Sequence, residues 1–264
     1  MNKQNQIAGF FTALFVSIAL SACALMQSGA PSAAKAELAS TGKVRVALIN
    51  VANFVAQPAA NPPTGMGVDL GKAIAARVGA PFEPVVYPSV AALLADARSG
   101  KWDMALLGVD PARGADFEFT RPYALVQNTY LVPTGSGLMT IADVDRKGVK
   151  VVVAARSAQH NYLKANLKQA ELGTYDGDAA QALIVGNFDA LAANRGTLEE
   201  LAASKPGYRL IPGSFSDVKY GVGVPKGRMA AASYLDGVVA DMLASGAIAE
   251  EIARAKLKGV SPAK

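Results

Sequence analysis

The sequence predicts an α/β protein built from doubly wound parallel sheets, and three observations lead to this fold class. Hydrophobic residues make up 51% of the 264 residues and charged residues only 18%, a composition that excludes intrinsic disorder. After residue 43, short apolar, β-branched runs alternate with stretches of helical periodicity, as in parallel sheets whose strands are joined by helices. The number of these elements favours two sheets over one.

Strands are expected wherever a short run of apolar or β-branched residues lies between turn signals. These runs lie at 44–49, 81–87, 102–107, 149–154, 171–175, 188–193 and 208–211, with longer extended stretches within 120–133 and at 218–224. Helices are expected where apolar residues recur every three or four positions: at 69–78, 89–98, 141–146, 157–168, 178–185, 198–204 and, interrupted near 245–246, at 228–256. Gly79 is placed to end the first of these helices, and Ser89, Thr140 and Ser157 are placed to cap the starts of three others.

The first residues predict a secretory signal peptide over residues 1–22. Lys3 gives a short positive region, and the apolar run at 7–20 is shorter than the ~20 residues that a membrane span needs. Residues 20–23 (LSAC) resemble a bacterial lipobox, which implies cleavage before Cys23 and attachment of lipid to that residue. The alternative is ordinary signal peptidase cleavage after Ala24, which completes an A-x-A pattern.

Cys23 is the only cysteine of the chain, and its place in the lipobox favours the lipoprotein interpretation. No disulfide, thiolate nucleophile or cysteine-ligated metal site is therefore expected in the mature protein. Residues 23–42 are rich in Ala, Ser and Gly and are expected to form a flexible tether between the lipid and the folded part.

Charge and motifs exclude several other classes of function. The net charge is +5, from 26 basic and 21 acidic residues, and no Lys/Arg-rich run occurs, so nucleic-acid binding is not expected. Neither a Walker A pattern nor a GxGxxG pattern is present, which argues against nucleotide hydrolysis and dinucleotide chemistry. No cofactor is expected.

Four segments together resemble the family 3 solute-binding proteins of ABC importers. They are 67–70 (GVDL) with the helix that follows, 100–103 (GKWD), Arg113 with 117–123 (FEFTRPY), and 220–224 (YGVGV). No single segment is specific, but their order and spacing extend over nearly all of the mature chain. The resemblance implies the type II periplasmic-binding-protein fold, in which two doubly wound lobes are joined by two crossover strands.

On this chain the resemblance implies that 43–131 and 220–262 form lobe I and that 134–217 forms lobe II. The crossovers would lie near 130–132 and 219–220, in agreement with the two long extended stretches. The ligand would sit between the lobes at the carboxyl ends of the strands, where α/β sheets generally bind ligands.

Arg113 is the first candidate for binding the ligand. In amino-acid-binding members of the family an arginine at this place binds the carboxylate of the ligand. A planar guanidinium suits this task because it donates two parallel, charge-assisted hydrogen bonds. The alternative is a salt bridge within the protein, to Asp110 or Asp116.

Ser157 and Asn194 are candidates from lobe II. Ser157 opens a helix where the family has Gly-Thr or Gly-Ser, so it could receive an anion or could simply cap the helix. Asn194 follows the 188–193 strand, near where amino-acid binders usually have an aspartate for the ammonium of the ligand. An asparagine cannot supply that charge, so the expected ligand is a carboxylate without an α-amino group or a modified amino acid.

Asp110 departs from the family, which usually has hydroxyl residues before the arginine. Asp110 could neutralise Arg113, contact a cationic part of the ligand, or act only as a turn residue before Pro111. Asn50, Asn53 and Phe54 follow the first strand, where the family has a wall of the pocket. Phe54 could stack on the ligand or pack on its own lobe.

These features predict an extracytoplasmic receptor, lipid-anchored in the periplasm or cell envelope. It would capture a small polar, carboxylate-bearing solute, such as an amino acid or a related organic acid, and deliver it to an ABC permease by closing its lobes, with no covalent chemistry. We expect a monomer. The alternatives are a ligand-sensing lipoprotein without a transport role and a lyase on the same fold, similar to cyclohexadienyl dehydratases. A lyase would need an acidic group such as Asp110, Glu199 or Glu200 at the ligand.

Overall fold

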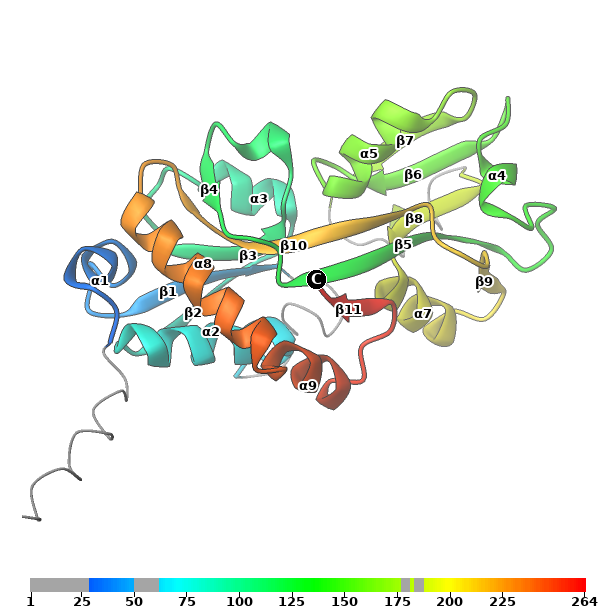
Figure 1. Ribbon diagram of the computed structural model, residues 1–264. Helices are drawn as coiled ribbons and strands as arrows, with labels where there is room; N and C mark the ends of the chain where they lie inside the picture. The colour runs from blue at the N-terminus through cyan, green and yellow to red at the C-terminus, as the bar shows by residue number, and fades with distance from the viewer. Residues whose placement is uncertain (1–28, 50–61, 177–180, 183–187) are drawn as a thin grey trace, which may run out of the picture.

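The β-strands form one continuous mixed sheet in the computed structural model, which describes residues 29–49, 62–176, 181–182 and 188–264 (Figure 1). The strand order is β2-β1-β3-β10-β5-β8-β6-β7, with β4 beside β10 and both β9 and β11 beside β5. The bounds are β1 Val44–Ile49, β2 Phe82–Tyr87, β3 Met104–Gly108, β4 Phe117–Phe119, β5 Ala124–Pro133, β6 Lys150–Ala154, β7 Glu171–Tyr175, β8 Ala190–Asn194, β9 Tyr208–Leu210, β10 Ser216–Pro225 and β11 Val260–Pro262. The α/β prediction is confirmed.

Parallel strands lie at both ends of this sheet. At one end β1 pairs in parallel with β2 and β3, and at the other β6 pairs in parallel with β7 and β8. The long antiparallel strands β5 and β10 run side by side between the two ends, as Figure 1 shows. The structure thus differs from the expected pair of sheets in one respect: β10 bonds to β3 and β5 bonds to β8, so both halves share a single sheet.

Helices cover both faces of the sheet at each end. Their bounds are α1 Ser32–Leu38, α2 Met66–Val78, α3 Val90–Ala95, α4 Ile141–Val144, α5 Ala158–Asn166, α7 Arg195–Ser204, α8 Met229–Ala244 and α9 Ala247–Arg254, with a 3-10 turn η1 at Pro111–Arg113. The helix signals act as expected: Gly79 ends α2 with φ 75°, and the Ser89 hydroxyl accepts a hydrogen bond from Ala92 N at 3.2 Å. The helix expected at 178–185 lies mostly outside the described residues.

Successive residues of β1 point to opposite faces of the sheet, and each face has its own hydrophobic core. Val46 and Leu48 pack with α2 and α8, whereas Ala47 and Ile49 pack with α3 and the buried Trp102. The second half has the same arrangement: one core contains Val151, Val153 and residues of α4 and α5, and the other contains Val152 and residues of α7. We call the half with β1–β4, α1–α3, α8 and α9 lobe I, and the half with β6–β9, α4, α5 and α7 lobe II.

Residues 32–38 form helix α1 rather than part of the flexible tether that the composition suggested. The side chains of Ala34 and Leu38 are buried in the lobe I core, with exposed fractions of 2% and 0%. The segment reads SAAKAEL, and Ala, Lys, Glu and Leu are strong helix formers as well as common linker residues. Composition alone therefore could not separate a tether from a helix that packs on the fold.

Glu37 and Lys35 fix α1 to neighbouring helices. The Glu37 carboxylate accepts a hydrogen bond from Ala231 N in the first turn of α8 at 2.7 Å, where a negative charge is favourable. Lys35 Nζ donates to the carbonyl of Gly79, which ends α2, at 3.0 Å. Helix α1 is therefore a structural part of lobe I.

Replacing Leu38 with Ala tests this placement. We expect the L38A variant to lose about 2–5 kcal/mol of unfolding free energy, because it leaves a cavity under α1. Met229, which begins α8, is 61% exposed, so M229A should change stability by less than about 0.5 kcal/mol. Urea unfolding of both variants measures the difference, and equal midpoints would show that α1 does not pack on lobe I.

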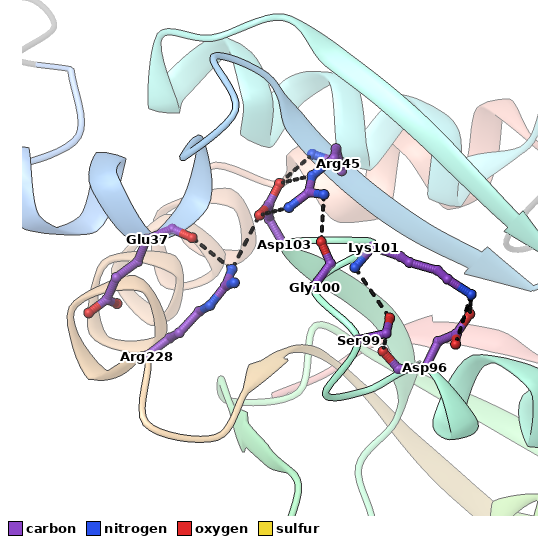
Figure 2. A network of polar contacts seen from close by, with 8 residues as sticks. All are labelled: Glu37, Arg45, Asp96, Ser99, Gly100, Lys101, Asp103 and Arg228. Carbon is purple, nitrogen blue, oxygen red and sulfur yellow. Dashed lines mark hydrogen bonds and ion pairs between the residues drawn. The ribbon is translucent and has the colours of Figure 1, made fainter.

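Asp103 is the centre of a second network in lobe I (Figure 2). Its carboxylate is fully buried and accepts hydrogen bonds from Arg45 Nε and Nη2 at 2.9 and 2.7 Å and from the Arg45 backbone N–H at 3.0 Å. Arg228 Nη1 lies 3.3 Å from the same carboxylate and also donates to the carbonyl of Glu37 at 2.8 Å. The network joins β1, the start of β3, α1 and the start of α8.

The D103N variant should lose about 3–5 kcal/mol of unfolding free energy, because it leaves two arginines without their buried counter-charge. Glu83, whose ion pair with Lys43 is well exposed, gives a matched control. We expect E83Q to cost less than about 1 kcal/mol in guanidinium chloride unfolding. A D103N variant as stable as E83Q would contradict a role for Asp103 in holding lobe I together.

None of the helices that the structure describes is long and apolar enough to span a membrane. The apolar run at 7–20 and Cys23 lie outside the described residues.

Candidate functional site

The two lobes meet at the carboxyl ends of β3, β6 and β8, on either side of the crossover strands. Arg113 ends η1, the turn that follows β3 in lobe I. Ser157 lies between β6 and α5 in lobe II, and Asn194 is the last residue of β8. The structure therefore brings Arg113, Ser157 and Asn194 to the same part of the molecule, although they are far apart in the sequence.

Arg113 is a buried cation with an exposed fraction of 6%. Its Nη1 donates to the carbonyl of Gly108 in lobe I at 2.5 Å, and its Nη2 donates to the carbonyl of Arg156 in lobe II at 3.1 Å. The buried Nε has no hydrogen-bond partner among the described residues. Burial lowers the pKa of the guanidinium and the nearby charge of Asp110 opposes this, but an arginine stays protonated in proteins.

Neither carboxylate that could have neutralised Arg113 forms an ion pair with it. Asp116 pairs with Arg98 on the surface, at 2.8 Å. Asp110 accepts a hydrogen bond from Ala112 N at 2.9 Å and thereby caps η1, as a turn residue would. The internal salt bridge that the sequence left open for Arg113 is absent from the part of the chain that the structure describes.

Asp110 also connects the lobes, because its second carboxylate oxygen accepts a hydrogen bond from Asn161 Nδ2 on α5. Gly108 lies close to the same helix: a Cβ atom at this position would be 3.3 Å from the Cβ of Ala158 and 2.9 Å from the side chain of Val218. A larger residue would push the lobes apart, so Gly108 permits their close approach.

Ser157 caps α5, as the helix-cap alternative proposed. Its hydroxyl oxygen accepts a hydrogen bond from His160 N at 3.0 Å, and the side chain is buried. No described residue accepts a hydrogen bond from this hydroxyl, which can therefore still act as a donor.

Asn194 belongs to a buried cluster of amides that the sequence did not reveal. Gln159 Nε2 donates to the Oδ1 of Asn194 and, at 2.9 Å, to the Oδ1 of Asn128. Asn194 Nδ2 lies 3.5 Å from the Tyr220 hydroxyl, the outer limit of a hydrogen bond. Two signals could have found these residues: Gln159 lies two positions after Ser157 in the same helix turn, and Tyr220 begins the YGVGV segment.

The remaining candidates lie outside the described residues: Asn53 and Phe54, together with Asn50. Among the residues that are described, no group of His, Cys, Asp and Glu side chains could hold a metal ion.

Arg156 has a backbone conformation that an L-residue rarely adopts, with φ 58°. Its N–H donates to His160 Nδ1 at 3.2 Å, and its carbonyl accepts from Arg113. The backbone of Arg156, rather than its side chain, therefore forms the contact to lobe I.

An R156G variant tests whether this conformation is strained. A left-handed residue with a Cβ costs about 1–2 kcal/mol, and glycine returns roughly 0.5–1 kcal/mol of this as chain entropy in the unfolded state. We expect R156G to raise Tm slightly and R156A, which keeps the Cβ, not to raise it. Thermal unfolding of both variants measures the effect, and an equal rise in both would assign the effect to the side chain.

The fold and site together define a two-lobed binding protein, in which polar side chains from both lobes meet beside two crossover strands. The profile of the family "Bacterial extracellular solute-binding proteins, family 3" matches residues 44–254. The chain belongs to this family. Its members are extracytoplasmic substrate-binding components of ABC importers, which confirms the type II periplasmic-binding-protein fold expected from the four segments.

Among known proteins, the chain is 26% identical over 193 residues to the L-cystine-binding protein TcyJ of Escherichia coli (strain K12), covering 70% of this chain and 71% of the relative. It is 24% identical over 198 residues to the ABC transporter glutamine-binding protein GlnH of Bacillus subtilis (strain 168), covering 72% and 71%. The structure is similar to a solute receptor for L-cysteine of Neisseria gonorrhoeae, with a TM-score of 0.75, 20% identity, and coverage of 87% of this chain and 99% of that one. The curated relatives are transport binding proteins, so this chain is a binding protein rather than an enzyme.

Proposed function

We propose that this protein captures a small carboxylate-bearing solute, an amino acid or a related organic acid, between its two lobes and delivers it to an ABC permease. The relatives named for cystine and glutamine support a ligand of this size and class. The observation that carries the proposal is the buried Arg113 guanidinium, which has an unpartnered Nε and no ion pair among the described residues.

A buried charge without a counter-charge costs folding free energy, which a bound anion would recover. The two carbonyls that accept from Arg113 are neutral and supply only partial charge. A carboxylate has the planar geometry that matches the Nε and Nη groups of one guanidinium edge, and such bidentate pairs are among the strongest hydrogen-bonded pairs in proteins. Arg113 would therefore fix the carboxylate of the solute.

Lobe closure around the solute would provide the signal that the permease reads. The hydrogen bonds from Arg113 to the Arg156 carbonyl and from Asn161 to Asp110 each join the two lobes. Both lie beside the crossover strands β5 and β10, which connect the lobes and could act as a hinge. A solute bound at Arg113 would touch the same side chain that donates to the Arg156 carbonyl across the lobes.

We further propose that the protein is a monomer held at the membrane by lipid on Cys23. The lipobox-like residues 20–23 support this attachment. Because α1 begins at Ser32, the segment between lipid and fold would be shorter than the tether of 23–42 that the sequence suggested.

The residues considered for a lyase are hydrogen-bonded within the protein, paired with an arginine or exposed. Asp110 is hydrogen-bonded to Ala112 N and Asn161. Glu199 lies on α7, 3.9 Å from Arg195, and Glu200 is exposed on the same helix. These placements support binding without chemistry.

The test is a thermal-shift screen against amino acids, organic acids and polyamines, followed by titration calorimetry of the best ligand with wild type and variants. We expect a carboxylate-bearing compound to raise Tm and the R113A variant to bind it about 100-fold more weakly, since a charge-assisted bidentate pair is lost. R98A removes an exposed arginine of the same lobe and should leave binding unchanged. Unchanged binding in R113A, or hits among polyamines alone, would contradict the proposal.

A further inference from the structure

We infer that the solute held at Arg113 is a carboxylic acid without an α-ammonium group, such as a 2-hydroxy or 2-oxo acid. This inference rests on the proposed function, and it names the ligand class for the same site. The juxtaposition that carries it is a buried cation, Arg113, beside a neutral cluster of amides formed by Gln159, Asn128 and Asn194.

The charges at the lobe interface favour a ligand with a net negative charge. Among the described residues, Arg113 is the only buried cation and Asp103 is the only buried carboxylate. Asp103 is bound by Arg45 and Arg228 and precedes β3, whereas Arg113 follows this strand, so about 17 Å of strand separates the two groups. The carboxylate of either kind of ligand would neutralise Arg113, but a zwitterion would also bring an ammonium for which the described residues offer no free buried carboxylate.

The amide cluster is neutral, and its own N–H groups use part of its acceptor capacity. One Gln159 nitrogen donates to the Oδ1 atoms of both Asn128 and Asn194, so the two N–H groups of this amide and one acceptor site on each asparagine are used. Asn128 Nδ2 in turn donates to Ser216 Oγ at 3.1 Å. The cluster can therefore offer a ligand ammonium only neutral amide oxygens and no carboxylate.

The carboxylate of Asp110, at the interface between the lobes, already has hydrogen-bond partners within the protein. Asp110 accepts from Ala112 N and from Asn161 and caps η1. An ammonium has three N–H donors and is strongly hydrated, so burying one here would cost free energy that no described carboxylate offsets. The α-amino group of an ordinary amino acid is therefore disfavoured.

A neutral polar group on the ligand has a suitable partner instead. The buried Ser157 hydroxyl accepts from His160 N and retains its proton, which can donate to a ligand oxygen. A hydroxyl or keto oxygen next to the carboxylate would accept this hydrogen bond, whereas an ammonium could not. Ser157 thus favours a hydroxyl or keto group over an ammonium at C2 of the ligand, as the neutral Asn194 does.

Matched ligands that differ only at C2 test the inference. Titration calorimetry on the purified protein would compare alanine, lactate and pyruvate; glutamate, 2-hydroxyglutarate and 2-oxoglutarate; and phenylalanine, 3-phenyllactate and phenylpyruvate. We expect the tightest-binding set to favour the hydroxy or oxo member over the amino member at least tenfold. The N194D variant adds a carboxylate and should shift this ratio at least tenfold towards the amino member. N166D makes the same change at an exposed site of α5 and should leave the ratio unchanged.

The outcomes separate this inference from the proposed function. If the amino member binds wild type as tightly as its partners, and R113A weakens both, the ligand class is wrong while the carboxylate site stands. If no member of any set binds, or if R113A binds as wild type does, the carboxylate site itself is wrong and the inference fails with it. If N194D does not fold, the wild-type ratio alone decides.

Discussion

Burying a guanidinium without a carboxylate partner opposes folding, and the structure around Arg113 is arranged so that this cost is partly offset rather than removed. The carbonyls of Gly108 and Arg156 accept two of its five N–H donors, and Nε has no partner among the described residues. A fully paired arginine would stabilise the protein and have nothing left for a ligand. The incomplete pairing of Arg113 connects the fold to its function, since an anion that arrives between the lobes gains the interaction that the protein lacks.

The second buried charge, that of Asp103, is fully paired within the protein. Asp103 lies at the start of β3, and Arg45, Arg228 and a backbone N–H satisfy its carboxylate within lobe I. The network also joins α1 and α8 to the sheet, so that β3, the strand that leads to the η1 turn and Arg113, is held in place. Asp103, just before β3, has all its hydrogen-bond partners within the protein and stabilises the fold. Arg113, beyond the carboxyl end of the same strand, has an unpartnered Nε among the described residues and is available for binding.

The sequence pattern predicted most of the helices and strands. Strands that are buried on both faces consist of runs of apolar residues, and the residues that cap helices have strong local preferences. Arg113 and Asn194 became candidates through the resemblance to the family, and Ser157 also because it follows a strand and opens a helix. Three kinds of feature were not predictable. Helix α1 has the composition of a linker, and its stability comes from packing on α8. Strands β4 and β11 are short and depend on their neighbours in the sheet. Gln159 and Asn128 became visible only when the fold brought α5 and β5 together.

A crystal structure of the protein with its solute bound tests the role of Arg113 most directly. We expect a carboxylate whose oxygens lie about 2.7–2.9 Å from Nε and an Nη of Arg113, with the solute enclosed by both lobes and Ser157 beside its C2 substituent. A solute held elsewhere, or one whose carboxylate binds another group while Arg113 Nε pairs with the protein, would contradict it.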